Sequence, residues 1–160
     1  MIVSYFAYGS NMDKQRMSAR APIYGACSAV LSGWELCFDK KASGRVEGKG
    51  YANIIPTPNG TVEGILYQTD EAGIKSLDGY EAYPNHYLKV MLDVVTEPDG
   101  AIHKALVYIA NPKQQRDGLY PTEEYLGHLL AGEGYLTPEY VERLASFTTL
   151  ESLAREKQVG

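Results

Sequence analysis

The first two thirds of the chain alternate between short apolar runs and turn residues, a pattern typical of β-strands. Residues 2–8 are β-branched and aromatic and end in Gly-Ser-Asn, which predicts a strand that runs into a turn. Pro58-Asn59-Gly60 and Pro98-Asp99-Gly100 predict the turns of two hairpins. Further strands are predicted at residues 23–38, 51–55, 61–68, 87–95 and 103–109.

Glycines mark two irregular stretches in this strand-rich part. Gly33 interrupts residues 23–38, which predicts either one long bent strand or two consecutive strands. Residues 39–50 are polar and contain Gly44, Gly48 and Gly50, so we expect a mobile loop there.

Helical patterns follow later in the chain. Residues 70–80 predict a short helix with Asp70 as its N-cap, although two glycines weaken it. After Pro121, apolar residues recur at helical spacing, and Thr137-Pro138 opens another helix. Strands followed by helices indicate an α+β fold, in which a largely antiparallel sheet can close into a barrel with helices packed outside. No repeat or break divides the chain, so residues 1–160 are expected to form one domain.

Composition and charge narrow the class of protein. The 160 residues are 44% hydrophobic, which is enough to bury a core. The net charge is −5, and the basic residues are scattered apart from Lys40, Lys41, Arg45 and Lys49, which argues against a nucleic-acid partner. The sequence has neither a membrane-length apolar run nor a signal-peptide pattern, so we expect no membrane partner and a cytoplasmic location.

The common catalytic motifs are missing from the sequence. It contains no phosphate-binding loop and no dinucleotide fingerprint, and His86, His103 and His128 are too isolated to form a zinc site. Cys27 and Cys37 lie in strand-like segments, where reduced thiols are expected. We therefore expect neither a cofactor nor a metal.

Two segments remain as candidate sites. In the first, Gly9 permits backbone angles that other residues avoid, so the N–H groups of residues 8–11 can converge on an anion. The alternative is that Gly-Ser-Asn only ends the strand. In the second, Glu81 shares a face with Ile74 and Leu77 if the helix persists past Gly79, and burial there would raise its pKa and make it a proton acceptor.

Glu81 also has simpler interpretations. A solvated or ion-paired surface position is equally compatible with the pattern. Asp78 is the competing acid, but an acidic residue beside a glycine usually caps a turn.

Together the two segments resemble the γ-glutamylcyclotransferase family. YFAYGSNM (residues 5–12) is similar to the signature turn of that family, and SLDGYEAYPNHYLKV (residues 76–90) places a glutamate four residues after a leucine, as the family does. The likeness continues, in order, through GYANIIP (50–56), VEGILYQ (62–68), VYIAN (107–111) and the helical residues 120–144.

The resemblance implies a small mixed, mostly antiparallel barrel with flanking helices and a small-molecule γ-glutamyl substrate. It implies a cyclisation that releases 5-oxoproline, with Glu81 as general acid/base. The residues that it implies for substrate binding are Tyr5, Phe6, Ala7, Tyr8, Gly9, Ser10, Asn11, Tyr87 and Tyr108. The chain departs from the better-known members in residues 39–50, so the resemblance does not define which group is accepted beyond the γ-amide.

Three alternatives remain at this point. The substrate could be another γ-glutamyl amide, such as a γ-glutamyl-amine or a γ-glutamyl-protected intermediate. The chain could be a non-catalytic module that binds a small ligand with the same fold. It could also be an interaction domain with exposed tyrosines, in which Glu81 would face solvent far from Gly9. A monomer and a homodimer are equally compatible with the sequence.

Overall fold

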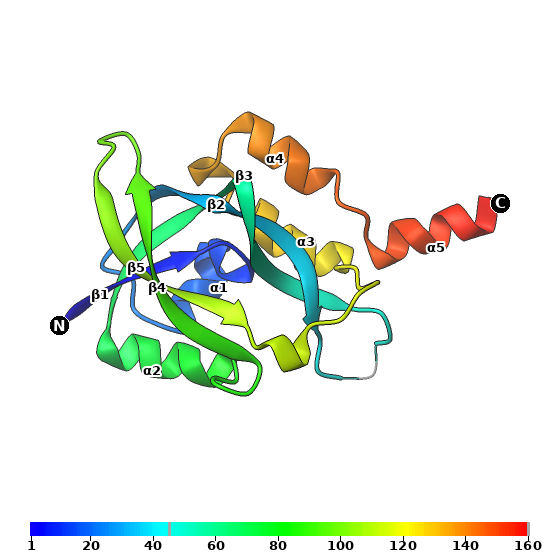
Figure 1. Ribbon diagram of the computed structural model, residues 1–160, viewed down its shortest axis with the longest axis horizontal. Coiled ribbons are helices and arrows are strands. Elements are labelled where there is room, and N and C mark those ends of the chain that lie inside the picture. Colours follow the sequence, from blue (N-terminus) through cyan, green and yellow to red (C-terminus); the bar gives the residue numbers. More distant parts are fainter. Residues whose placement is uncertain (45, 160) are drawn as a thin grey trace.

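The computed structural model describes residues 1–44 and 46–159, and five strands of this part form a closed barrel (Figure 1). The strands lie in the order β1-β3-β2-β4-β5. Neighbouring strands are antiparallel except β1 and β5, which are parallel and close the barrel at Tyr5 and Leu106. The strands are β1 (Ile2–Ala7), β2 (Gly25–Lys41), β3 (Gly50–Asp70), β4 (Tyr87–Thr96) and β5 (Ile102–Ala110).

Helices cover the outside of the barrel. Figure 1 shows α2 along one side, α3 and α4 on the other, and α5 projecting away from it. None of the described helices combines the length and apolarity needed to cross a membrane. The helices are α1 (Lys14–Ser18), α2 (Glu71–Tyr80), α3 (Glu123–Leu130), α4 (Pro138–Ala145) and α5 (Leu150–Val159). The α+β barrel with flanking helices is therefore confirmed.

One of the two predicted hairpins is wrong. Residues 51–55 and 61–68 belong to the single strand β3, and both halves pair with β2 rather than with each other. The register moves from Ser32 opposite Thr61 to Trp34 opposite Pro56, so residues 57–60 form a bulge. Asn59 there adopts a φ of 64°. The turn residues are used for this bulge because β2 is long enough to pair with both halves.

The other local predictions have mixed outcomes. The hairpin of β4 and β5 is confirmed, and Asp70 caps α2 by accepting a hydrogen bond from Gly73 N–H at 2.7 Å. Residues 25–41 form one strand, so residues 39–41 belong to β2 rather than to the predicted loop, where Arg45 lies outside the described residues. α1 and α5 were not predicted, because their short or strongly polar sequences have no clear apolar face.

Candidate active site

The end of β1 and the turn that follows it open onto a small cavity of about 40 Å³. Glu81, which directly follows α2, and side chains from β3, β4, β5 and α3 complete its wall. The lining residues are Tyr5, Phe6, Tyr8, Gly9, Ser10, Asn11, Ala52, Glu81, Tyr87, Tyr108 and Tyr125. The fold thus brings the two predicted segments to one place, although they are about 70 residues apart in the sequence.

Ala7 does not line this cavity, unlike the rest of the predicted turn. It is buried at the end of β1, opposite Ile65 of β3. Ala7 therefore packs in the barrel wall beside the cavity.

Gly9 is required for a different reason from the one that the sequence indicated. Its φ is −113°, so the turn does not use the left-handed backbone conformation that favours glycine. A Cβ at this position would instead lie 3.2 Å from Ala52 Cβ and 3.7 Å from Tyr125 Oη. Close approach of neighbouring side chains, rather than a left-handed φ, favours glycine here.

The backbone of the turn presents free donors. The first hydrogen bond of the 3-10 turn Ser10–Met12 runs from Met12 N–H to Gly9 O at 3.0 Å. The N–H groups of Ser10 and Asn11 precede it and have no acceptor within this turn. Both residues line the cavity.

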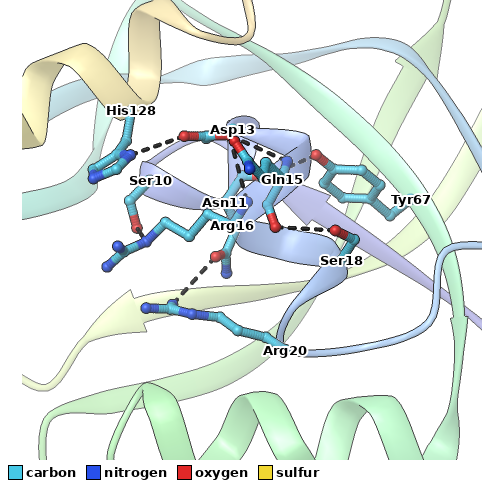
Figure 2. Close-up of polar contacts among 9 residues, drawn as sticks. All are labelled: Ser10, Asn11, Asp13, Gln15, Arg16, Ser18, Arg20, Tyr67 and His128. Atoms are coloured by element: carbon cyan, nitrogen blue, oxygen red, sulfur yellow. Dashed lines mark hydrogen bonds and ion pairs between the residues drawn. The ribbon is translucent and has the colours of Figure 1, made fainter.

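Side chains from α1 and its flanks hold the turn in place (Figure 2). Arg16 Nε donates a hydrogen bond to Ser10 Oγ at 3.2 Å, and Arg20 Nη1 donates one to Asn11 Oδ1 at 3.2 Å. The buried hydroxyl of Tyr67 donates to Asn11 O at 2.7 Å. The backbone of the turn is therefore fixed before any ligand binds.

Glu81 enters the cavity from the end of α2. Its N–H donates to Leu77 O at 2.8 Å and its φ is −85°, so the helical turn persists past Gly79 as the sequence predicted. Ile74 and Leu77 on the same face are buried. Among the described residues, no hydrogen bond or ion pair to the Glu81 carboxylate is formed.

The surroundings of Glu81 make it a base near neutral pH. Burial raises the pKa of Glu81 from 4.5 to about 7, because the charged form loses hydration. The nearby cations Arg20, Lys40 and Arg16 oppose this shift. A carboxylate with such a pKa can accept a proton at pH 7 and release it again.

Tyrosines of the cavity wall are fixed by hydrogen bonds. Tyr8 Oη donates to Tyr108 O at 2.6 Å, and Tyr108 Oη donates to Asp78 Oδ1 at 2.7 Å. Tyr87 Oη donates to Ala52 O at 2.8 Å. Burial raises the pKa of all three phenols, so they stay neutral and rigid. Asp78, the competing acid, holds Tyr108 and Lys89 and does not line the cavity.

A wider pocket of about 240 Å³ adjoins the cavity, and we call it the outer chamber. It shares Ser10, Glu81, Tyr87 and Tyr125 with the cavity. Its other lining residues are Arg16, Arg20, Lys40, Ser43, Tyr51, Tyr80, Ala82 and His86.

Sequence reasoning missed Ala52, Tyr125 and the three cations of the outer chamber. The spacing of Arg16 and Arg20, four residues apart just after the turn, was an available signal, because it places both on one side of a helical turn. Lys40 had no such signal, since it lies within a strand. Its position depends on how far β2 extends.

Other reactive groups lie outside this site. Cys27 and Cys37 are half-buried free thiols, and burial raises the pKa of Cys37 to about 12. His128 Nδ1 lies 2.9 Å from Asp13 Oδ2 (Figure 2). Within residues 1–44 and 46–159, no three His, Cys, Asp or Glu side chains are grouped to hold a metal ion. Glu81 is the one carboxylate among the described residues that line the cavity.

The shared cavity also argues against the alternative that the chain is an interaction domain with exposed tyrosines. In that alternative, Glu81 would face solvent far from Gly9, whereas both residues line one cavity. Tyr5, Tyr8, Tyr87 and Tyr108 are buried around it instead of forming an exposed surface.

Comparisons with known proteins agree with this arrangement. The sequence profile of the family described as "Gamma-glutamyl cyclotransferase, AIG2-like" matches residues 5–127. A γ-glutamylcyclotransferase from Mus musculus is 30% identical over 146 residues, which cover 88% of this chain and 76% of the relative. One from Homo sapiens is 28% identical over 151 residues, with the same coverage.

The fold is shared as well. A solved structure described as a γ-glutamyl cyclotransferase superposes with a TM-score of 0.80 at 24% identity, covering 93% of this chain and 89% of that one. The profile spans more than half of the chain and includes both the turn and Glu81. The chain belongs to the γ-glutamylcyclotransferase, AIG2-like family.

Proposed function

We propose that this protein is a γ-glutamylcyclotransferase that releases 5-oxoproline from a γ-glutamyl amide or peptide, with Glu81 as general acid/base. The observation that carries the proposal is the Glu81 carboxylate, which lacks a described ion-pair partner and shares a small cavity with the turn of residues 8–11. The match to relatives named γ-glutamylcyclotransferase supports it.

The glutamyl part of the substrate supplies its own nucleophile. Its α-amine attacks the γ-carbonyl carbon and closes a five-membered ring, so no nucleophile from the protein is needed. Folding the glutamyl chain back inside the cavity provides proximity, for which intramolecular reactions reach effective molarities of about 10⁵ M or more. The buried tyrosines are rigid and neutral, which suits them to hold this conformation.

Proton transfer is the task of Glu81. The α-amine is an ammonium at neutral pH and cannot attack until a base removes one proton. Glu81 takes this proton, the amine forms the new C–N bond, and the γ-carbonyl oxygen becomes negatively charged. When the old C–N bond breaks, Glu81 returns the proton to the departing amine, which restores the carboxylate. The ring nitrogen loses its second proton, through Glu81 or solvent, to the departing amine, which leaves as an ammonium while 5-oxoproline keeps one N–H.

The N–H groups of Ser10 and Asn11 are placed to bind an oxygen of the substrate. That oxygen is either the developing oxyanion or the α-carboxylate. Loss of one donor to an oxyanion typically costs about 3 kcal/mol of transition-state stabilisation. Because the donors belong to the backbone, the conformation of the turn matters more than its side chains.

The direct test replaces Glu81 with glutamine and measures 5-oxoproline released from γ-glutamyl dipeptides. Glu81→Gln keeps the size of the side chain but cannot accept the proton, so we expect a loss of at least about a hundredfold in kcat with the fold intact. A circular dichroism spectrum and melting curve check the fold.

Asp78→Asn is the matched control, because it removes a neighbouring carboxylate that does not line the cavity. It disturbs only the contacts to Tyr108 and Lys89, so we expect a smaller loss of activity. Retention of more than about a tenth of the activity by Glu81→Gln would remove Glu81 from the role of general acid/base.

A further inference from the structure

The outer chamber carries positive charge that the described part of the protein does not neutralise. Arg16, Arg20 and Lys40 line it, and Glu81 is the only carboxylate among its described lining residues. The chain as a whole has a net charge of −5, so this cationic cluster does not reflect a generally basic surface.

The three cations have uncharged partners. The ion pairs formed among the described residues include none of them. Each donates instead to a neutral oxygen: Arg16 Nε to Ser10 Oγ at 3.2 Å, Arg20 Nη1 to Asn11 Oδ1 at 3.2 Å, and Lys40 Nζ to Lys41 O at 2.6 Å.

Burial makes these unpaired charges costly. Lys40 is only 2% exposed, with its ammonium over the rings of Tyr51 and Tyr87. Arg20 is half-buried, with its guanidinium 4.4 Å from the ring centroid of Tyr80. A buried charge without a counter-ion destabilises a protein, whereas a ligand that supplies the counter-ion gains affinity. The chamber is therefore suited to an anionic group.

The charges of the substrate indicate how many negative charges are needed to neutralise the outer chamber. The glutamyl part carries one ammonium and one α-carboxylate, which cancel. In the carboxylate form that accepts the proton, Glu81 offsets one of the three cations, so two positive charges remain, and proton transfer from the ammonium to Glu81 does not change this total. A leaving group with two carboxylates would balance them.

We propose that the outer chamber selects γ-glutamyl compounds whose leaving group carries two carboxylates, as in a γ-glutamyl derivative of an acidic amino acid. This inference rests on the proposed function, because the chamber receives the part beyond the γ-amide only when the glutamyl part occupies the cavity. Arg16, Arg20 and Lys40 are then specificity-determining residues.

The experiment compares three substrates that differ in the charge of one side chain: γ-glutamyl-glutamate, γ-glutamyl-glutamine and γ-glutamyl-lysine. The first two have nearly the same size and shape. At pH 7 and low salt, we expect kcat/KM to be about tenfold higher for γ-glutamyl-glutamate than for γ-glutamyl-glutamine, and lowest for γ-glutamyl-lysine. Added salt should reduce the ratio, because it screens the charges.

Variants connect the selectivity to the chamber. Arg20→Gln and Lys40→Met should lower the glutamate-to-glutamine ratio toward one, while Arg20→Lys should keep most of it. Lys104→Met is the control: it removes one positive charge, but Lys104 is exposed and lies 3.6 Å from Asp93 on β5 and β4, so the ratio should not change. If Lys40→Met does not fold, the two Arg20 variants and the salt dependence test whether the selectivity arises in the outer chamber.

The possible outcomes separate the two proposals. Equal kcat/KM for γ-glutamyl-glutamate and γ-glutamyl-glutamine would overturn the charge selection and leave the cyclisation standing. A ratio that persists unchanged in Arg20→Gln and Lys40→Met would also overturn it, because the selection would then lie elsewhere. Release of no 5-oxoproline from any of the three substrates would overturn the proposed function itself.

Discussion

Burial of the Glu81 carboxyl links the candidate chemistry to the stability of the fold. Its pKa is about 7 in the folded protein against 4.5 for the exposed group. Below pH 4.5 the carboxyl is protonated in both states and burial has no electrostatic cost. As the pH rises from 4.5 to 7, the carboxyl ionises in the unfolded chain but stays protonated in the folded protein, so stability falls over this range and the full loss remains at higher pH.

Glu81→Gln should therefore stabilise the protein in a pH-dependent way. At pH 8 we expect the variant to exceed the wild type by up to about 3 kcal/mol in free energy of unfolding, and at pH 4 by close to nothing. Urea denaturation at the two pH values measures the difference. A gain that is the same at both would mean that the Glu81 carboxyl titrates normally in the folded protein.

Gly9→Ala tests how closely the turn is packed. The added methyl group would lie 3.2 Å from Ala52 Cβ, so the turn must move by a few tenths of an ångström and its N–H groups with it. We expect a KM several-fold higher and a stability loss of about 1 kcal/mol. Ser10→Ala, which leaves the backbone unchanged, should affect steady-state kinetics less; the reverse order would show that the turn acts through side chains.

At the scale of elements, α1 depends on a cap that also ties it to α3. Asp13 Oδ1 accepts hydrogen bonds from Gln15 N–H at 3.1 Å and Arg16 N–H at 3.4 Å (Figure 2). Its Oδ2 lies 2.9 Å from His128 Nδ1. The hydrogen bond with His128 lowers the pKa of Asp13, so this carboxylate contributes stability at neutral pH that is lost as the pH falls through its folded value.

Removing this cap should loosen the turn as well as the helix. We expect Asp13→Ala to cost about 1 kcal/mol of stability and to raise KM, because Arg16 no longer holds Ser10 in place. Asp13→Asn keeps a capping oxygen and should recover most of the loss at pH 7. Equal damage from the two substitutions would assign the effect to the charge on Asp13 and not to capping.

At the scale of the whole molecule, the cavity exists because the barrel closes. The parallel contact of β1 with β5 brings Tyr5 next to Tyr108, whose rings lie 5.7 Å apart edge to face. The close approach of β1 to β3 requires Gly64, where a Cβ would collide with Ala7 O and lie 2.9 Å from the Phe6 ring. The Ala7 oxygen belongs to the backbone and cannot rotate away as the end of a side chain can. An added Cβ would therefore displace the barrel wall itself.

Gly64→Ala and Gly127→Ala should change stability in opposite directions. The first forces β1 away from β3, and we expect a loss of about 2 kcal/mol together with lower activity. The second lies in α3 with nothing near its added methyl group, and should gain up to about 1 kcal/mol from helix propensity. Thermal melting of the two variants compares them, and a neutral Gly64→Ala would mean that the wall is not tightly packed.

Local patterns were sufficient for most elements of this fold. Asp70 capped its helix and residues 98–100 reversed the chain as expected, because caps and short turns depend on neighbours in the sequence. Residues 58–60 carried an equally strong turn signal and became a bulge. Whether such residues reverse the chain depends on the partner strand, and β2 lies some 25 residues away.

The sequence by itself predicted that residues 5–11 end a strand in a turn, and that Glu81 shares the apolar face of Ile74 and Leu77 if the helix persists past Gly79, because both follow from spacing of a few residues. The tertiary structure alone decided that these two features share a cavity and that burial there raises the pKa of Glu81 to about 7. It also decided that Arg16, Arg20 and Lys40 gather beside them. Burial and proximity of charges depend on how distant segments pack, which no local pattern contains.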